Sequence, residues 1–115
     1  MTARDGTPLG TVEVVLDGEL DIATFGDAQR QVESAEATEP PLLVLDLSDL
    51  TFVDSTGVRL ALLADDHARA AGRRFAVRLG SGHALRVFEA LGLVDKLDVL
   101  PPKPAGGSSP DPAVP

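Results

Sequence analysis

The feature that most constrains the fold is a short, almost uninterrupted apolar segment near the middle of the chain. Residues 42–47 read Leu-Leu-Val-Leu-Asp-Leu, without the alternation of apolar and polar positions that marks a half-exposed strand. A strand of this kind is typical of a sheet that is covered on both faces. Because strand-like and helix-like segments alternate on either side of it, we predict an α/β protein with parallel crossovers and helices packed on a sheet.

The other elements are indicated by β-rich runs that end in turn residues and by apolar residues at helical spacing. The expected strands are residues 11–16, 42–47, 75–79 and 96–100. The expected helices are about residues 25–35, 55–71 and 84–91, with N-cap candidates at 21–24 before the first. A turn is predicted at residues 17–18, where the first strand ends, and a short connection at 48–53.

The length of 115 residues suits one domain. The last fifteen residues contain six of the nine prolines and a Gly-Gly-Ser-Ser segment. Proline cannot donate a backbone hydrogen bond to a helix or a sheet, so we predict a disordered tail at 101–115 after a folded domain at 1–100.

Composition narrows the class of partner. The chain has 18 acidic and 10 basic residues, a net charge of −8, which disfavours nucleic acid. The absence of Cys excludes disulfides and Cys-based metal sites, and the absence of Trp and Tyr disfavours a base-stacking surface. Residues 1–54 carry 12 acidic and 2 basic residues, whereas residues 55–115 carry 6 acidic and 8 basic. No apolar run is long enough for a signal peptide or a membrane span, which predicts a cytoplasmic protein without membrane contact.

Residues 54–57, Asp-Ser-Thr-Gly, open the second expected helix and include the candidate functional residues. Asp54 is a good N-cap, because its carboxylate can accept hydrogen bonds from the free N–H groups of the first turn. Ser55 and Thr56 then lie in that turn, with their hydroxyl groups near the surface. The positive end of the helix dipole tolerates an anion, such as a phosphate of about −1.5 to −2 charge. A capping sequence without any further role would explain the same residues.

Several segments resemble the STAS domain of bacterial anti-sigma factor antagonists in residues, order and spacing. They are residues 18–21 (Gly-Glu-Leu-Asp), 43–48 (Leu-Val-Leu-Asp-Leu-Ser), 52–58 (Phe-Val-Asp-Ser-Thr-Gly-Val) and 85–93, which resembles the family's late helix ending in Gly-Leu. The resemblance covers residues 10–100 and implies a single STAS-like domain, with a mixed β-sheet packed against α-helices.

The resemblance also implies a regulatory function without an enzymatic activity of the chain itself. In regulatory members, the serine after this Asp is phosphorylated by an anti-sigma factor with serine kinase activity, and here that serine is Ser55. The unphosphorylated form binds the anti-sigma factor and releases the sigma factor, and a metal-dependent serine phosphatase resets the protein. The expected partner surface includes Asp21, Asp54, Thr56 and Gly57. We expect no cofactor and no metal, and a monomer when the chain is free.

The chain departs from the family pattern at two points. Many members have a second glycine where this chain has Arg59. We expect Arg59 on the partner surface, where its guanidinium could bind a phosphate on Ser55 or an acidic side chain; a solvated helix charge is the other interpretation. Members often end in another helix, whereas Pro101 and Pro102 follow the last expected strand here.

Two other functions remain open for the same pattern of residues. A STAS-like accessory subunit of a membrane transport system, such as a lipid transporter, would use residues 54–56 for structure or docking, without a phospho-switch. An aspartyl-phosphate receiver would need Asp46 as the acceptor, but Asp46 lies inside the apolar strand and Lys96 precedes the last strand instead of following it.

An enzyme or a ligand-binding domain is a weaker alternative, because no catalytic set converges in the sequence. Residues 80–82, Gly-Ser-Gly, are followed by Leu85 where a dinucleotide fingerprint needs its third glycine. His67 is expected on a solvated helix face, and His83 in a loop or the first turn of a helix.

Overall fold

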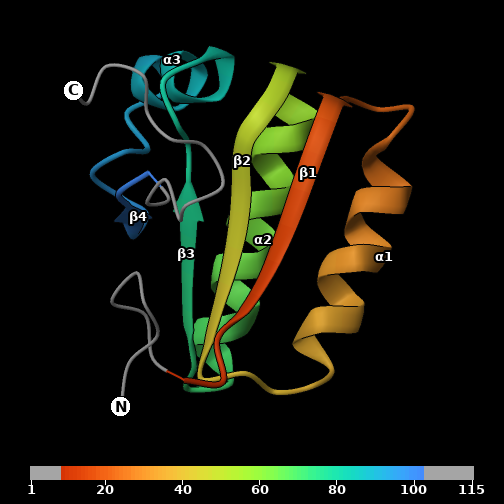
Figure 1. Cartoon of the computed structure of the whole chain (residues 1–115), viewed down its shortest axis with the longest axis vertical. Coiled ribbons are helices and arrows are strands. Elements are labelled where there is room, and N and C mark those ends of the chain that lie inside the picture. Colours follow the sequence, from red (N-terminus) through yellow and green to blue (C-terminus); the bar gives the residue numbers. More distant parts are fainter. Residues whose placement is uncertain (1–8, 103–115) are drawn as a thin grey trace, which may run out of the picture.

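Strands and helices alternate along the chain, as the sequence predicts (Figure 1). The computed structural model describes residues 9–102 of the 115. The strands are β1 (Val12–Leu20), β2 (Leu42–Val53), β3 (Arg74–Arg78) and β4 (Val99–Leu100). The helices are α1 (Phe25–Glu36), α2 (Ser55–Ala70) and α3 (His83–Ala90).

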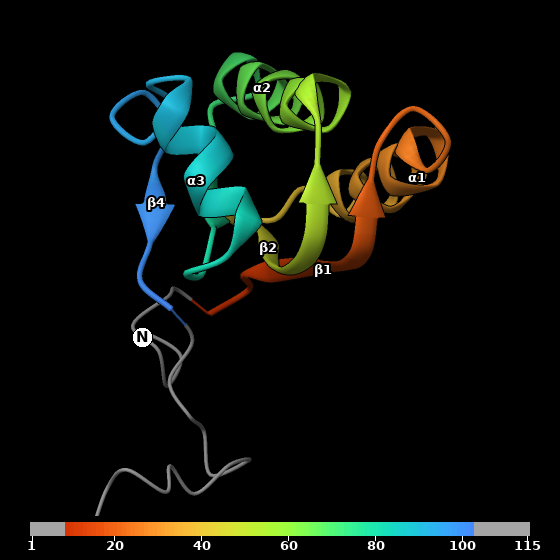
Figure 2. The same ribbon diagram turned by 90° about the horizontal axis from the view of Figure 1, so that it is seen from above.

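The four strands form one sheet in the order β1-β2-β3-β4, and every neighbouring pair is parallel. The predicted α/β class and the predicted crossovers are therefore confirmed. A mixed sheet would also contain an antiparallel pair, and within residues 9–102 there is none. Because the order in the sheet equals the order in the sequence, β1 and β4 are the two opposite edges of the sheet (Figure 2).

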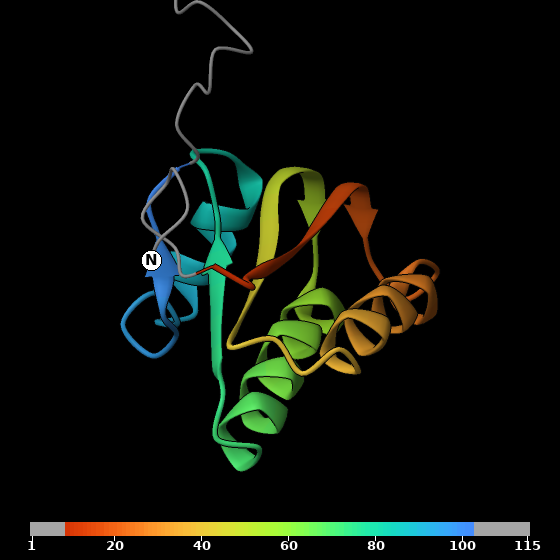
Figure 3. The same cartoon turned by 60° about the horizontal axis from the view of Figure 1, so that its bottom comes forward.

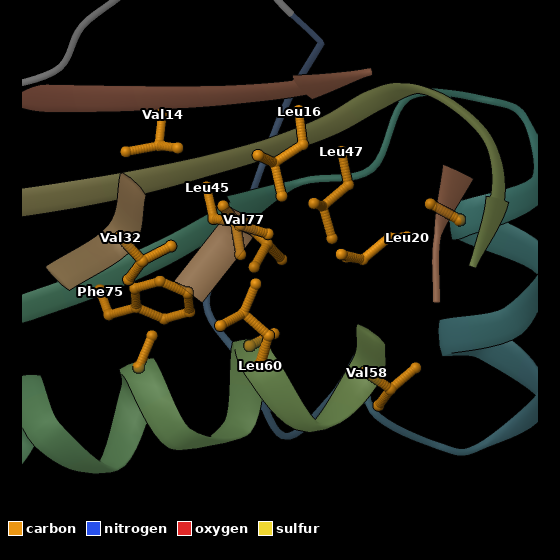
Figure 4. Close-up of a cluster of buried hydrophobic side chains, with 14 of the residues drawn as sticks. Val14, Leu16, Leu20, Val32, Leu45, Leu47, Val58, Leu60, Phe75 and Val77 are labelled. Atoms are coloured by element: carbon orange, nitrogen blue, oxygen red, sulfur yellow. The ribbon is translucent and has the colours of Figure 1, made fainter. Parts of the chain in front are cut away.

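The main core lies between one face of the sheet and the helices (Figures 3 and 4). Alternate residues of the strands point into it, since successive side chains of a strand face opposite ways. The strand residues of this cluster that Figure 4 labels are Val14, Leu16, Leu20, Leu45, Leu47, Phe75 and Val77. Helix α2 contributes Val58 and Leu60, and α1 contributes Val32. This packing fixes α2, and with it the candidate site, against the end of the sheet.

The opposite face of the sheet is also buried where β2 and β3 pair. Leu42, Val44 and Ala76 form a second, smaller cluster there. All six residues from 42 to 47 are buried, which confirms the prediction that this segment is a strand covered on both faces.

Three predicted boundaries are wrong. The strand expected at residues 96–100 begins only at Val99, and the other two errors share one physical origin. The predicted turn at residues 17–18 lies inside β1, and the predicted connection at 48–53 is the second half of β2. The strands pair irregularly here, with register shifts on both sides of the Asp17–Gly18 segment, and Gly18 takes a φ of 73°. A bulge of this kind keeps a strand going through residues that ordinarily favour a turn. Of the predicted tail, residues 103–115 lie outside the described part of the chain.

Candidate functional site

The candidate site lies at the carboxyl ends of β1 and β2, at the top of Figure 1. Leu20 and Val53 are paired as the last residues of their strands. The N–H group of Asp54, the residue after β2, donates to the Leu20 carbonyl at 3.3 Å. The two strand ends therefore hold Asp21 and Asp54 next to the start of α2.

Asp54 is the N-cap of α2, which confirms the sequence prediction. One oxygen of its carboxylate, Oδ1, accepts from the N–H groups of Thr56 at 2.9 Å and of Gly57 at 3.2 Å. These bonds satisfy two of the amide groups that a helix start leaves free. Ser55 is the first residue of the helix and is exposed, whereas Thr56 is half-buried. The cap thus holds the backbone on either side of Ser55 while its hydroxyl group faces solvent.

Asp21 fixes the loop at the neighbouring strand end, whereas the N-cap of α1 is Thr24, without a side-chain capping bond. Its Oδ1 accepts from the N–H groups of Ala23 at 2.9 Å and Thr24 at 3.1 Å, and the hydroxyl group of Thr24 donates to the Glu19 carbonyl at 2.9 Å. These bonds tie the loop between β1 and α1 into a fixed turn. Asp21 is half-buried, so the turn presents part of its carboxylate to solvent.

The other two predicted site residues differ in where they lie. Arg59 is exposed on α2, and within residues 9–102 it forms no ion pair. Gly57 is buried and lies against the strand ends: a Cβ atom there would come within 2.6 Å of Val53 Cγ2 and 2.9 Å of the Leu20 carbonyl oxygen. The sequence placed Gly57 on the partner surface, but its position in the fold makes it the residue that lets α2 approach the sheet.

Two residues that the sequence did not single out for the site also belong to it. His83, the first residue of α3, accepts through Nδ1 from the Val53 N–H group at 3.1 Å. Its ring stacks on Phe52 with a centroid distance of 5.3 Å and an interplanar angle of 23°. The link joins residues thirty positions apart, so no local pattern could have predicted it.

Other candidate groups lie elsewhere or are engaged. Asp46 is 3% exposed and accepts from the Ser48 N–H group, which removes it as an exposed phosphate acceptor. His67 is exposed on α2, as expected, and lies 3.9 Å from Glu36. Among residues 9–102, no group of three or more His, Asp or Glu side chains is placed to hold a metal ion.

A groove of about 640 Å³ lies between α1 and α2. It contains the ion pair of Glu36 and Arg73, and none of the predicted site residues lines it. The groove is therefore separate from the Ser55 region. In the described part of the chain, no helix combines the length and the apolar character needed to cross a bilayer.

The fold and this site define the chain as a STAS-type domain. The family model described as "Mlab, STAS domain" matches residues 4–101, and the chain belongs to that family. No curated protein matches the sequence.

Solved structures of anti-sigma factor antagonists share the fold. One from Mycobacterium paratuberculosis is 23% identical, with a TM-score of 0.74 over 89% of this chain and 92% of the other. SpoIIAA in its unphosphorylated form is 23% identical, with a TM-score of 0.68 over 94% and 89%. The phosphorylated form of the Bacillus cell fate determinant SpoIIAA is 23% identical, with a TM-score of 0.63 over 94% and 92%.

Proposed function

We propose that this protein is an anti-sigma factor antagonist that is switched by phosphorylation of Ser55. The observation that carries the proposal is the exposed Ser55 at the start of α2, directly after an Asp54 whose carboxylate caps that helix. Membership of the STAS family and the likeness of fold to SpoIIAA support it. The unphosphorylated form binds an anti-sigma factor with serine kinase activity and so releases the sigma factor.

The cap explains why a phosphate here would act on a partner more than on the fold. The N–H groups of Thr56 and Gly57 already donate to Asp54. A phosphate on Ser55 could accept these hydrogen bonds only by displacing the Asp54 carboxylate. It instead adds a dianion to the surface beside Asp21 and Asp54. The helix dipole offsets part of the repulsion within the chain, whereas a partner packed on this surface has to desolvate the added charge. Binding therefore weakens while the fold persists.

The chain is proposed to bring no chemistry of its own to this cycle. The kinase holds the nucleotide, and a serine phosphatase resets the protein. Asp21, Asp54, Thr56 and Arg59 form the surface that these partners contact, and Gly57 sets the position of α2 within it. The cycle places the protein in the cytoplasm of a bacterium.

The proposal is tested by incubating the protein with ATP and its cognate kinase-type anti-sigma factor. Mass spectrometry is expected to find one phosphate, on Ser55, and none on Ser55→Ala. Thr56→Ala is the matched control for the neighbouring hydroxyl group and is expected to be labelled. Full labelling of Ser55→Ala would overturn the assignment of the acceptor.

A binding measurement tests the switch itself. Ser55→Ala is expected to bind the anti-sigma factor like the wild type, and Ser55→Asp more weakly, because only the latter adds negative charge. Equal binding by both variants would contradict the switch. Binding to a transport ATPase or permease in place of an anti-sigma factor would favour the transporter subunit.

A further inference from the structure

Two large apolar side chains are exposed at the strand ends beside Ser55. Ile22, two residues after the end of β1, is 81% exposed, and Phe52, the residue before the end of β2, is 40% exposed. Single exposed apolar residues are common on protein surfaces. Phe52, however, lies in β2 and Ile22 lies in the turn that follows β1, and the last residues of these two adjacent strands, Leu20 and Val53, are paired. We call Ile22 and Phe52 the strand-end pair.

The backbone at Ile22 and the ring of Phe52 are held in place. Ile22 lies within the turn that Asp21 closes by accepting from the N–H groups of Ala23 and Thr24. Phe52 stacks on His83. An apolar group that is ordered before binding loses less conformational entropy when a partner covers it, and groups of this kind are typical anchors of protein interfaces.

The charges around the strand-end pair indicate what kind of surface can cover it. Glu19 pairs in register with Phe52, and Asp17 pairs with Asp49, so that two exposed carboxylates lie side by side on neighbouring strands. Like charges in this arrangement destabilise a sheet. In the described chain, none of these three acids forms an ion pair. A partner that supplies Arg or Lys side chains would remove this repulsion.

We propose that the strand-end pair is the apolar anchor of the partner interface, and that Asp17, Glu19 and Asp49 form its acidic rim. The occupant is a protein surface with an apolar pocket that is ringed by Arg and Lys side chains. This inference rests on the proposed function, in which that surface belongs to the anti-sigma factor. A second copy of the chain does not fit, because a symmetric contact would set the same carboxylates against each other.

The two parts of this interface affect binding in different ways. Buried apolar anchors determine mainly how long a complex lasts, whereas rim charges determine mainly how fast it forms and how it responds to salt. Ile22 and Phe52 should therefore control the dissociation rate. The acidic rim should control the association rate.

The test measures association and dissociation rates with the purified anti-sigma factor kinase from the phosphorylation assay. Ile22→Ala is expected to raise the dissociation constant at least about tenfold, through faster dissociation. Leu63→Ala and Leu91→Ala are the matched controls, since both residues are exposed (44% and 54%) but lie on α2 facing the groove and at the end of α3. Both are expected to bind within about twofold of the wild type, as peripheral truncations do.

The acidic rim is tested by a separate variant in the same rate measurements. The double variant Asp17→Asn, Asp49→Asn is expected to associate more slowly at low salt and to lose most of the salt dependence of association. Its dissociation rate is expected to change little. A salt dependence equal to that of the wild type would overturn the assignment of the rim.

The outcomes separate this inference from the function on which it rests. If the wild type does not bind the anti-sigma factor, both fail. If the wild type binds and Ile22→Ala binds equally well, the anchor is overturned while the phospho-switch stands. If the two control variants weaken binding as much as Ile22→Ala does, the effect is general to exposed apolar residues, and the anchor is again overturned.

Discussion

At the scale of single residues, the start of α2 combines a fixed backbone with an exposed hydroxyl group. Asp54 accepts two backbone hydrogen bonds, Gly57 lies against the strand ends, and Ser55 between them faces solvent. The N-cap could be predicted from the sequence, because capping depends on residues next to each other in the chain. The close approach at Gly57 could not, because it depends on Leu20, which is 37 positions away.

The cap itself can be tested by two substitutions at one position. Asp54→Ala is expected to lower the free energy of unfolding by about 1 kcal/mol, because the N–H groups of Thr56 and Gly57 lose their acceptor. Asp54→Asn keeps an acceptor oxygen and should lose much less. Urea denaturation of both variants measures the difference. If both variants lose the same free energy of unfolding, the negative charge of Asp54, and not its capping hydrogen bonds, stabilises the fold.

The close approach of Gly57 to the strand ends can be tested with a glycine-to-alanine substitution there and with a control substitution for which the opposite effect is expected. Gly57→Ala is expected to destabilise the protein by about 1–3 kcal/mol, because the new Cβ atom meets Val53 and the Leu20 carbonyl. Alanine ordinarily favours a helix over glycine, so a loss here would be steric in origin. Gly26→Ala in α1, where the nearest atom is 3.7 Å away, should be neutral or stabilising. Thermal unfolding of the two variants compares them, and a stable Gly57→Ala would contradict the packing.

At the scale of elements, the sequence predicted the cores of strands and helices better than their ends. The apolar segment at 42–47 and the amphipathic α2 are confirmed nearly residue for residue, because burial on two faces or on one stripe leaves a clear pattern. The outer half of the β1–β2 pair leaves no regular pattern, since its buried residues, Leu20, Leu50 and Val53, are separated by exposed residues such as Asp17 and Asp49 that suit turns equally well. Pairing between the strands, which is a non-local property, decides the structure there.

The link between α3 and β2 is a second non-local feature and can be tested by hydrogen exchange. His83→Ala leaves the Val53 N–H group without its acceptor, and exchange at that amide should accelerate about fivefold, as expected for a hydrogen bond worth about 1 kcal/mol. His83→Asn offers an oxygen near the position of Nδ1 and should restore most of the protection. Faster exchange throughout the sheet in both variants would instead indicate a general loss of stability.

At the scale of the whole molecule, the uneven charge of the sequence becomes a difference between two sides. Sheet order follows sequence order, so the acidic half of the chain forms β1, α1 and β2, and the more basic half forms β3, α3 and β4 toward the other edge and α2, which packs between the two parts (Figure 1). Ser55 begins α2 where these two sides meet. Composition alone indicated only that nucleic acid is a poor partner, whereas the topology gives the molecule an acidic face that includes Asp17, Glu19 and Asp49.

Within residues 9–102, Asp17, Glu19 and Asp49 form no ion pair, so their repulsion should reduce stability, and removing part of it should increase stability. Asp49→Asn is expected to raise the free energy of unfolding by up to about 0.5 kcal/mol at low salt, because it relieves the repulsion from Asp17 on the paired strand. The gain should shrink as added salt screens the wild-type repulsion. Asp98→Asn is the matched control: Asp98 pairs with Arg74 at 2.8 Å, so its loss should leave stability unchanged or slightly lower. Urea denaturation at low and high salt measures both variants. A less stable Asp49→Asn would mean that Asp49 stabilises the fold, which would remove the physical reason for assigning it to a partner.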